Sequence, residues 1–222
     1  MSCPPTPAGA PADPTPTKHR KAPAAAMTEL GLDDHSTISA ALQLARLWCD
    51  GQRIGPQDAL THALQVVDVL RRHVPDAAPE VIAAALLHDS PELAPPGLDL
   101  HAVLVTLLSP EVARLVEALQ HEHDGLSAGT VPRPPADDSA TMQASAADKI
   151  VSIATVLERA RTDDPSAYWS TRSGFVAALP YFRAFTAAAE HVLPSTMTAE
   201  LGDLVDRAVA AATPTRPAGP LS

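Results

Sequence analysis

Hydrophobic residues recur along this chain at intervals of three and four positions, the spacing that places side chains on one face of an α-helix. The first such segment carries Ile38, Leu42 and Ala45, and either Asp33 or Asp34 is suited to cap its N-terminus. No segment alternates polar and apolar residues as a half-buried strand does. The pattern therefore predicts an all-α fold.

The same pattern predicts further helices, bounded by residues that cap or break helices. Their ranges are 58–72, 79–88, 99–108, 109–119, 143–162, 166–192 with a break or kink at Pro180, and 197–212. The helix at 79–88 is apolar on nearly all sides, so we expect it at the centre of the fold. Residues 51–57, 91–97 and 120–142 are expected to be loops.

Composition divides the chain of 222 residues into one domain and two tails. Residues 1–26 and 213–222 are rich in Pro and poor in large apolar residues, so we expect both to be disordered. The folded domain is then 27–212. Aromatic residues make up only 3% of the chain, so its core must consist mainly of Ala, Leu and Val, which favours helices over sheets.

Charge and cysteine content narrow the partners and the compartment. Sixteen basic residues against 26 acidic ones give a formal net charge of −10, which argues against a general nucleic-acid binder. We expect a cytoplasmic protein without a membrane partner, because there is no signal peptide, no long apolar run and no disulfide framework. The Ala-rich helical segments at 186–192 and 199–212 fit packing on a second copy in a homo-oligomer and internal packing equally well.

Four side chains in or beside apolar helices are candidates for metal binding: His62, His88, Asp89 and Asp148. A buried carboxylate is costly unless it is paired or bound to a metal, and Asp89 has no cation near it in sequence. The next charge, Glu92, has the same sign. Two imidazoles and two carboxylates suit a transition ion such as Mn, Fe, Co or Zn better than Mg or Ca.

Each candidate also has a structural explanation. His62 is compatible with a core histidine that is hydrogen-bonded to backbone, and Glu92 with an exposed loop acid. Asp89 could accept hydrogen bonds from backbone amides in the turn that follows it. Asp148 could cap a helix beginning at Lys149.

A second His–Asp dipeptide provides a comparison within the chain. His123–Asp124 lies in a polar stretch, and Gly125 follows where a C-cap glycine belongs, so we expect a solvated helix end. The alternative is a rival metal cluster of His121, His123 and Asp124. The apolar helix before His88 has no counterpart here, which favours His88–Asp89 as the functional pair.

The order His62, His88–Asp89, Asp148 resembles the H…HD…D signature of the HD-domain superfamily of metal-dependent phosphohydrolases. The stretch from Ala41 to Glu92 is similar in spacing to the hydrolase domain of RelA/SpoT proteins, and more closely to the small alarmone hydrolases. The segments SAADKIVSIATVLERAR and SAYWSTRSGFVAALPYF resemble later parts of that domain. The likeness covers about residues 38–190.

The resemblance implies a single HD-domain helical bundle that binds one divalent ion, commonly Mn²⁺, through His62, His88, Asp89 and Asp148. Glu92 would be the catalytic carboxylate that orients the attacking water or takes its proton, because it matches the first residue of the family's Glu–Asp pair.

The resemblance also implies substrate contacts, with departures from the family pattern. Arg46 matches a basic residue near the nucleotide base, and Lys149 matches the basic residue after the last metal-binding Asp. Ser152 replaces an Asn near the nucleoside. Leu93 replaces the second acid of the pair, and Leu47 replaces a basic residue.

The implied function is metal-dependent hydrolysis of a phosphorylated nucleotide, most closely removal of the 3′-diphosphate from (p)ppGpp. A first alternative within the superfamily is a nucleoside monophosphate phosphatase or another small phosphohydrolase, which also has an acid three residues after its His–Asp pair. A second alternative is a degenerate domain that binds a nucleotide without turnover, which Leu93 favours. A third is a purely structural helical bundle.

Overall fold

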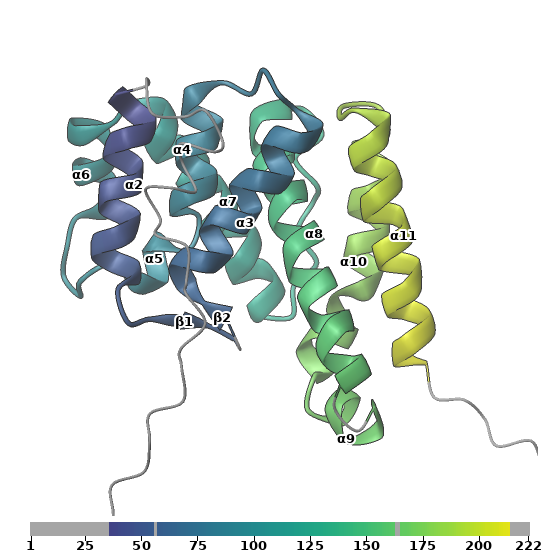
Figure 1. The fold of residues 1–222 in the computed structure, drawn as a ribbon. Helices are drawn as coiled ribbons and strands as arrows, with labels where there is room; N and C mark the ends of the chain where they lie inside the picture. The colour runs from purple at the N-terminus through teal and green to yellow at the C-terminus, as the bar shows by residue number, and fades with distance from the viewer. Residues whose placement is uncertain (1–35, 56, 163–164, 214–222) are drawn as a thin grey trace, which may run out of the picture.

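The computed structural model describes residues 36–55, 57–162 and 165–213. These residues form ten helices and one short antiparallel ladder (Figure 1). The elements are α2 (Ser36–Cys49), β1 (Arg53–Ile54), β2 (Gln57–Asp58), α3 (Ala59–His73), α4 (Pro79–Leu87), α5 (Ser90–Leu93), α6 (Leu100–Leu107), α7 (Pro110–Ser127), α8 (Ser139–Thr162), α9 (Pro165–Ser170), α10 (Ser173–Ala189) and α11 (Ser195–Ala212). The all-α prediction is confirmed.

Parts of the sequence-based predictions lie outside the described residues. These are the tail at 1–26, the capping role of Asp33 or Asp34, and the C-terminal tail beyond Thr213. Within the described part, no helix combines the length and the apolar character that a membrane span requires.

The helix α4 lies at the centre of the bundle, as its apolar sequence predicts. Every side chain from Val81 to Leu87 is buried, and α4 packs against α2, α3, α7 and α8. The three alanines Ala83, Ala84 and Ala85 are fully buried, and their small side chains let the neighbouring helices approach closely. The C-terminus of α4 therefore lies in the middle of the bundle.

The 24-residue helix α8 is the second central element. It packs against α3, α4, α7 and α11, and Ala144, Ala146 and Ala147 are buried in these contacts. Figure 1 shows α3 and α8 side by side, with α10 and α11 on the far side of α8. This arrangement brings the middle of α8 next to α3 and to the end of α4.

Three helices begin at side chains that cap them, in agreement with the predicted starts. Asp58 accepts a hydrogen bond from the backbone N–H of Thr61 at the start of α3. Asp99 and Ser109 cap α6 and α7 in the same way. Local sequence is sufficient to place these helix starts.

The predicted loop at 120–142 is wrong, because α7 continues to Ser127 and α8 already begins at Ser139. Gly125 lies within α7 and is not its C-cap. The backbone N–H and the hydroxyl of Thr130 both donate to the carbonyl of Gly125, at 2.9 and 2.8 Å, so the chain folds back over the helix end. Gly129, with φ 72°, takes the left-handed conformation that was expected at Gly125.

The helix predicted at 166–192 is divided at a different place. The break falls between α9 and α10, at residues 171–172, and α10 runs unbroken through Pro180. Pro180 is exposed, so water can reach the carbonyl that the missing N–H leaves without a partner. The predicted break at 91–97 also contains most of the single turn α5.

Candidate metal centre

Three helices bring the four predicted metal ligands together. His62 comes from α3, Asp148 comes from α8, and the pair His88–Asp89 follows the last residue of α4. One donor atom from each of His62, His88 and Asp89 lies within 4.8 Å of the others. The Oδ1 of Asp148 lies 3.2 Å from the Nε2 of His62 and 3.5 Å from the Nε2 of His88.

Both imidazoles are held by the secondary structure that carries them. His62 is buried on the inward face of α3, one turn before Val66 and two before Leu70. The Nδ1 of His88 is 2.9 Å from the carbonyl oxygen of Ala85. A carbonyl only accepts hydrogen bonds, so the proton of a neutral His88 is on Nδ1, and the Nε2 lone pair faces the cluster.

The carboxylate of Asp89 supplies a buried acceptor that has no hydrogen bond. Its Oδ2 lies 3.1 Å from the Nε2 of His88 and 3.8 Å from that of His62, yet it accepts a hydrogen bond from neither. An orphaned buried carboxylate oxygen is costly in a protein interior. This oxygen is therefore available to a cation, whereas the Nε2 atoms of His62 and His88 lie 3.2 Å apart, within hydrogen-bond distance of each other.

The spacing of these atoms fits a small transition ion. Bonds of about 2.1 Å to nitrogen and oxygen place neighbouring ligand atoms about 3.0–3.4 Å apart in octahedral or tetrahedral geometry. The nitrogen-to-oxygen separations here run from 3.1 to 3.8 Å. His62, His88 and Asp89 therefore fit one divalent cation with mixed nitrogen and oxygen ligands, and Asp148 lies beside the two imidazoles but outside this group of three.

The structure does not show the capping roles that would explain two of the candidates. Asp89 stands at the N-cap position of α5 but makes no side-chain capping hydrogen bond. Asp148 lies in the middle of α8 and caps no helix. The Nε2 of His62 lies 3.2 Å from Asp148 and 3.2 Å from the Nε2 of His88. Glu92 matches its structural alternative, because it is exposed.

The electrostatics of the cluster couple the acids to the imidazoles. Burial by itself would lower the pKa of His88, but the carboxylates of Asp89 and Asp148 outweigh it and raise that pKa well above its ordinary value. Burial would likewise raise the pKa of Asp148, but its contacts with the imidazoles of His123, His62 and His88 hold that pKa well below the ordinary value. Positive charge at this point stabilises the two carboxylates, as a divalent cation would.

Glu92, the predicted catalytic carboxylate, lies one turn from this cluster. Glu92 is exposed on α5, and its backbone N–H donates to the carbonyl of Asp89 at 3.1 Å. Leu93, the next residue, is half-buried against the hydrophobic core, so this turn offers one carboxylate to solvent.

Ser152 and Arg46, two of the predicted substrate contacts, lie close to the centre. The hydroxyl of Ser152 donates to the Oδ1 of Asp148 at 3.1 Å. Arg46 is half-buried in the last turn of α2, and no ion pair or hydrogen bond of its guanidinium is seen among the described residues. Its neighbours Ala45 and Trp48 line a small cavity together with Asp89, so this turn of α2 borders the centre.

The third predicted substrate contact, Lys149, is engaged elsewhere. Its ammonium is buried, lies 2.7 Å from the Oε1 of Glu122, and donates to the hydroxyl of Ser145 at 2.7 Å. It also lies 4.5 Å from the ring centre of Phe185. In this arrangement the charge of Lys149 is neutralised inside the protein and is not offered to a substrate.

One residue of the cluster was missed by sequence reasoning. The Nε2 of His123 lies 3.4 Å from the Oδ2 of Asp148, so His123 is not part of a solvated helix end. The rival cluster does not form, since His121 and Asp124 are both exposed. A signal was available, because Leu119 and His123 are four residues apart and continue one inward stripe of α7.

Comparison with known proteins adds no family to this geometry. No model of a known protein family matches the chain, and no curated protein matches it significantly. The interpretation of the centre therefore rests on the residues and distances described above.

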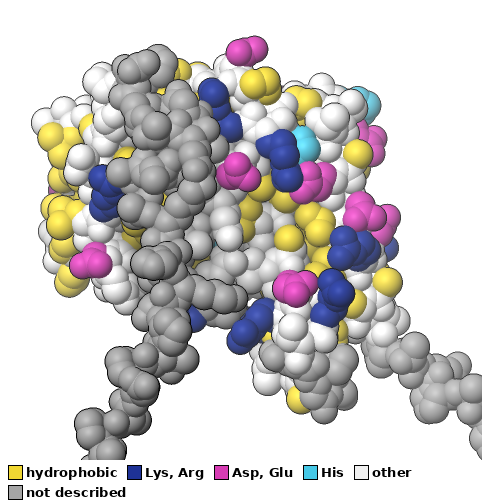
Figure 2. Space-filling model, viewed as in Figure 1, with side chains coloured by type: hydrophobic (Ala, Val, Ile, Leu, Met, Phe, Trp, Pro, Cys, Tyr) yellow, Lys and Arg dark blue, Asp and Glu magenta, His cyan; other side chains and the backbone are white. Residues whose placement is uncertain are grey.

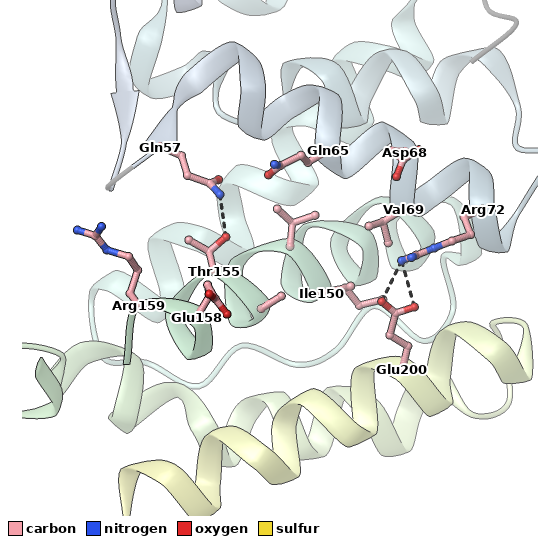
Figure 3. A pocket seen from close by; sticks show the side chains of 12 residues that line it. Gln57, Gln65, Asp68, Val69, Arg72, Ile150, Thr155, Glu158, Arg159 and Glu200 are labelled. Atoms are coloured by element: carbon pink, nitrogen blue, oxygen red, sulfur yellow. Dashed lines mark hydrogen bonds and ion pairs between the residues drawn. The ribbon is translucent and has the colours of Figure 1, made fainter. Parts of the chain in front are cut away.

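A groove of about 510 Å³ between α3, α8 and α11 is separate from the cluster (Figure 3). Arg72 donates to both carboxylate oxygens of Glu200 at one end, and Gln57 donates to Thr155 at the other. Acidic and basic side chains lie next to one another on this face instead of forming a patch of one sign (Figure 2). None of the four candidate ligands lines the groove.

Glu200 joins α11 to α3 at this groove, and its replacement tests that role. His73 Nε2 lies 2.7 Å from its carboxylate, in addition to the contacts from Arg72. We expect Glu200→Gln to lower the free energy of unfolding by about 1 kcal/mol, the scale of partly exposed ion pairs. Urea denaturation measures it, with Asp203→Asn as the control, because Asp203 forms only an exposed pair with Arg207. Equal losses in both variants would contradict the bridging role.

Proposed function

We propose that this protein is a metal-dependent phosphohydrolase that acts on a nucleotide. One observation carries the proposal: the convergence of two imidazole nitrogens and two carboxylate oxygens at 3.1–3.8 Å, around an oxygen of Asp89 that no hydrogen bond satisfies. A protein that only needed a stable core would gain nothing from this arrangement, because buried charges without full pairing are destabilising.

His62, His88, Asp89 and Asp148 would hold the ion, and Mn²⁺ is the first one to test because the ligand set is mixed and the resemblance to HD domains implies it. A divalent ion in such a site makes water a stronger acid and polarises a phosphoryl oxygen. The resemblance also implies the substrate class.

Glu92 would serve as the general base. It is exposed on the turn that immediately follows Asp89, so its carboxylate can meet substrate and water that arrive from solvent. It would take a proton from the attacking water while the bond from phosphorus to the leaving oxygen breaks. Arg46, on the neighbouring turn of α2, would bind a phosphate or the base.

The preferred reaction is removal of the 3′-diphosphate of a (p)ppGpp-type nucleotide, and the runner-up is hydrolysis of a nucleoside monophosphate. Two observations support the runner-up reaction as an alternative. Leu93 packs against the core where the second acid of the (p)ppGpp hydrolases would stand, and Lys149 is paired with Glu122. A monophosphatase would need only the acid at Glu92. Binding without turnover is the third outcome, and Leu93 would be its cause.

Turnover by the metal-loaded protein tests the proposal. Stripped protein reloaded with Mn²⁺ is incubated with (p)ppGpp, nucleoside monophosphates and NADPH, and the products are separated by chromatography. We expect diphosphate release from (p)ppGpp. We expect Asp89→Ala to lower the rate by more than about 10³-fold, beyond the cost of losing one transition-state hydrogen bond.

Asp124→Ala is the matched control, because Asp124 belongs to the other His–Asp dipeptide and is exposed. It should retain full activity. Monophosphate release from another nucleotide would move the protein to the runner-up reaction. Metal binding without turnover on any substrate would overturn the catalytic proposal and leave a binding domain.

A further inference from the structure

Two neighbouring residues on α7 face two neighbouring residues on α8. Glu122 pairs with Lys149, and His123 lies against Asp148, so a charged pair and a hydrogen-bonded pair cross the same helix interface side by side. One member of the second pair is a candidate metal ligand. The other member, His123, has no role in the function proposed above.

The two oxygens of Asp148 have different surroundings. Oδ1 faces the cluster, 3.2 Å from the Nε2 of His62, and also accepts a hydrogen bond from Ser152 at 3.1 Å. Oδ2 faces α7, where the Nε2 of His123 lies at 3.4 Å. The carboxylate is therefore held from both sides, with one oxygen directed at the cluster and the other at His123.

The imidazoles of His88 and His123 differ in role: one can bind an ion as a ligand, and the other donates a hydrogen bond. The Nδ1 of His88 is 2.9 Å from a carbonyl oxygen, so Nε2, which lies 3.2 Å from the Nε2 of His62, is the nitrogen that can offer a lone pair to an ion. His123 approaches the acceptor Oδ2 with Nε2, so that nitrogen must carry a proton to form the hydrogen bond. With that proton in place, the same nitrogen is not available to an ion.

The buried pair beside it fixes the position of α7 relative to α8. The side chains of Glu122 and Lys149 are 5% and 4% exposed, and Ser145 and the hydroxyl of Tyr181 both donate to Glu122. These contacts connect the carboxylate of Glu122 to α8 and α10. A shift of α7 along α8 would break them and would withdraw the adjacent His123 from Asp148.

We propose that His123 is a positioning residue of the metal centre, which holds the carboxylate of Asp148 with Oδ1 toward the two imidazoles. The buried Glu122–Lys149 pair keeps α7 in the register that this hydrogen bond requires. This inference rests on the proposed function, because that function requires a metal ion and the role assigned to His123 is to position a ligand of that ion. Mutation of a residue that hydrogen-bonds to a metal ligand typically lowers metal affinity by 10- to 100-fold.

Metal binding by matched histidine variants tests the role. Mn²⁺ affinity is measured by electron paramagnetic resonance, and the visible spectrum of the Co²⁺-loaded protein reports the ligand geometry. We expect His123→Leu to weaken Mn²⁺ binding by 10- to 100-fold and to change the Co²⁺ spectrum. The control is His121→Leu, the same change two residues away on the exposed side of α7, which should match the wild type.

Two conservative variants keep the test valid if His123→Leu does not fold. Gln carries its amide donor near the position of Nε2, whereas Asn carries it near Nδ1, one bond too short to reach Asp148. Affinity and spectrum should therefore be retained in His123→Gln and lost in His123→Asn. Wild-type values in both the Leu and Asn variants would overturn the inference alone, whereas a wild-type protein that binds no metal would overturn the proposed function together with it.

Discussion

Saturating Mn²⁺ should raise the midpoint of thermal unfolding of the wild-type protein by about 5–10 °C, and Asp89→Asn should remove this response. An ion that binds only the native state stabilises it by about 2.7 kcal/mol when its concentration is 100 times the dissociation constant. For a domain of this size, each kcal/mol corresponds to about 2–4 °C. The four donor atoms come from α3, α8 and the end of α4, so they meet only in the folded chain.

Asparagine at position 89 keeps the size of the side chain but removes the charge and one oxygen donor. The matched control is Asp124→Asn, the same change in the second His–Asp dipeptide, where the carboxylate is exposed and accepts a hydrogen bond from Gln120. That variant should respond to Mn²⁺ as the wild type does, and a chelator should reverse both responses. If Mn²⁺, Co²⁺, Fe²⁺ and Zn²⁺ all leave the wild-type midpoint unchanged, the cluster does not bind an ion of this class.

The sequence predicts most of the fold because the information is local. Hydrophobic periodicity locates the helices, and Asp58, Asp99 and Ser109 begin three of them as expected. The errors fall where contacts distant in sequence override a local signal. Gly125 is a normal stop signal, but Thr130 returns to its carbonyl and α7 continues past it.

The residues of the candidate site likewise divide into those that local sequence identifies and those that depend on contacts distant in sequence. His88 and Asp89 were distinguished from the second His–Asp dipeptide by the apolar helix before them, and the structure places these two residues with His62 and Asp148. His123 was missed because its partner is 25 residues away on another helix. The stripe shared by Leu119 and His123 indicates that His123 faces inward, but nothing in the sequence identifies Asp148 as its partner.

Lys149 shows the limit of carrying over a residue by position. Its place directly after Asp148 suggests a basic group at the site, but adjacent residues on a helix point about 100° apart. Asp148 contacts His62 on α3, His88 after α4 and His123 on α7. Lys149 instead contacts Glu122 on α7 and Tyr181 on α10. Only the three-dimensional packing decides which of the two neighbours lies at the cluster.

Lys149→Met should lower the free energy of unfolding by about 3–5 kcal/mol, because it leaves the buried carboxylate of Glu122 without its cation. Methionine keeps most of the volume of the side chain, so the loss is mainly electrostatic. In Glu122→Gln/Lys149→Met both charges are absent, and most of the loss should be recovered. Arg114→Met is the control, since its ion pairs with Glu111 and Asp138 are partly exposed and worth about 1 kcal/mol or less.

The dependence on pH gives this prediction a second, independent readout. Burial would raise the pKa of Glu122, but Lys149 and the hydrogen bonds from Ser145 and Tyr181 hold it below the ordinary value of 4.5. In the wild type the ionised pair therefore stabilises the fold above pH 4.5, and this contribution is lost as the pH falls through the lower native pKa. In Lys149→Met the balance reverses, because burial then raises the pKa of Glu122.

The penalty in Lys149→Met should thus be largest at neutral pH and should shrink as the pH falls toward 4.5, where Glu122 takes up a proton. Urea denaturation between pH 7 and pH 4.5 measures the difference from the wild type. That difference should narrow steadily, while the difference for Glu122→Gln/Lys149→Met should change much less. A loss in Lys149→Met that is independent of pH would show that lost packing against Phe185, not an uncompensated charge, causes the destabilisation.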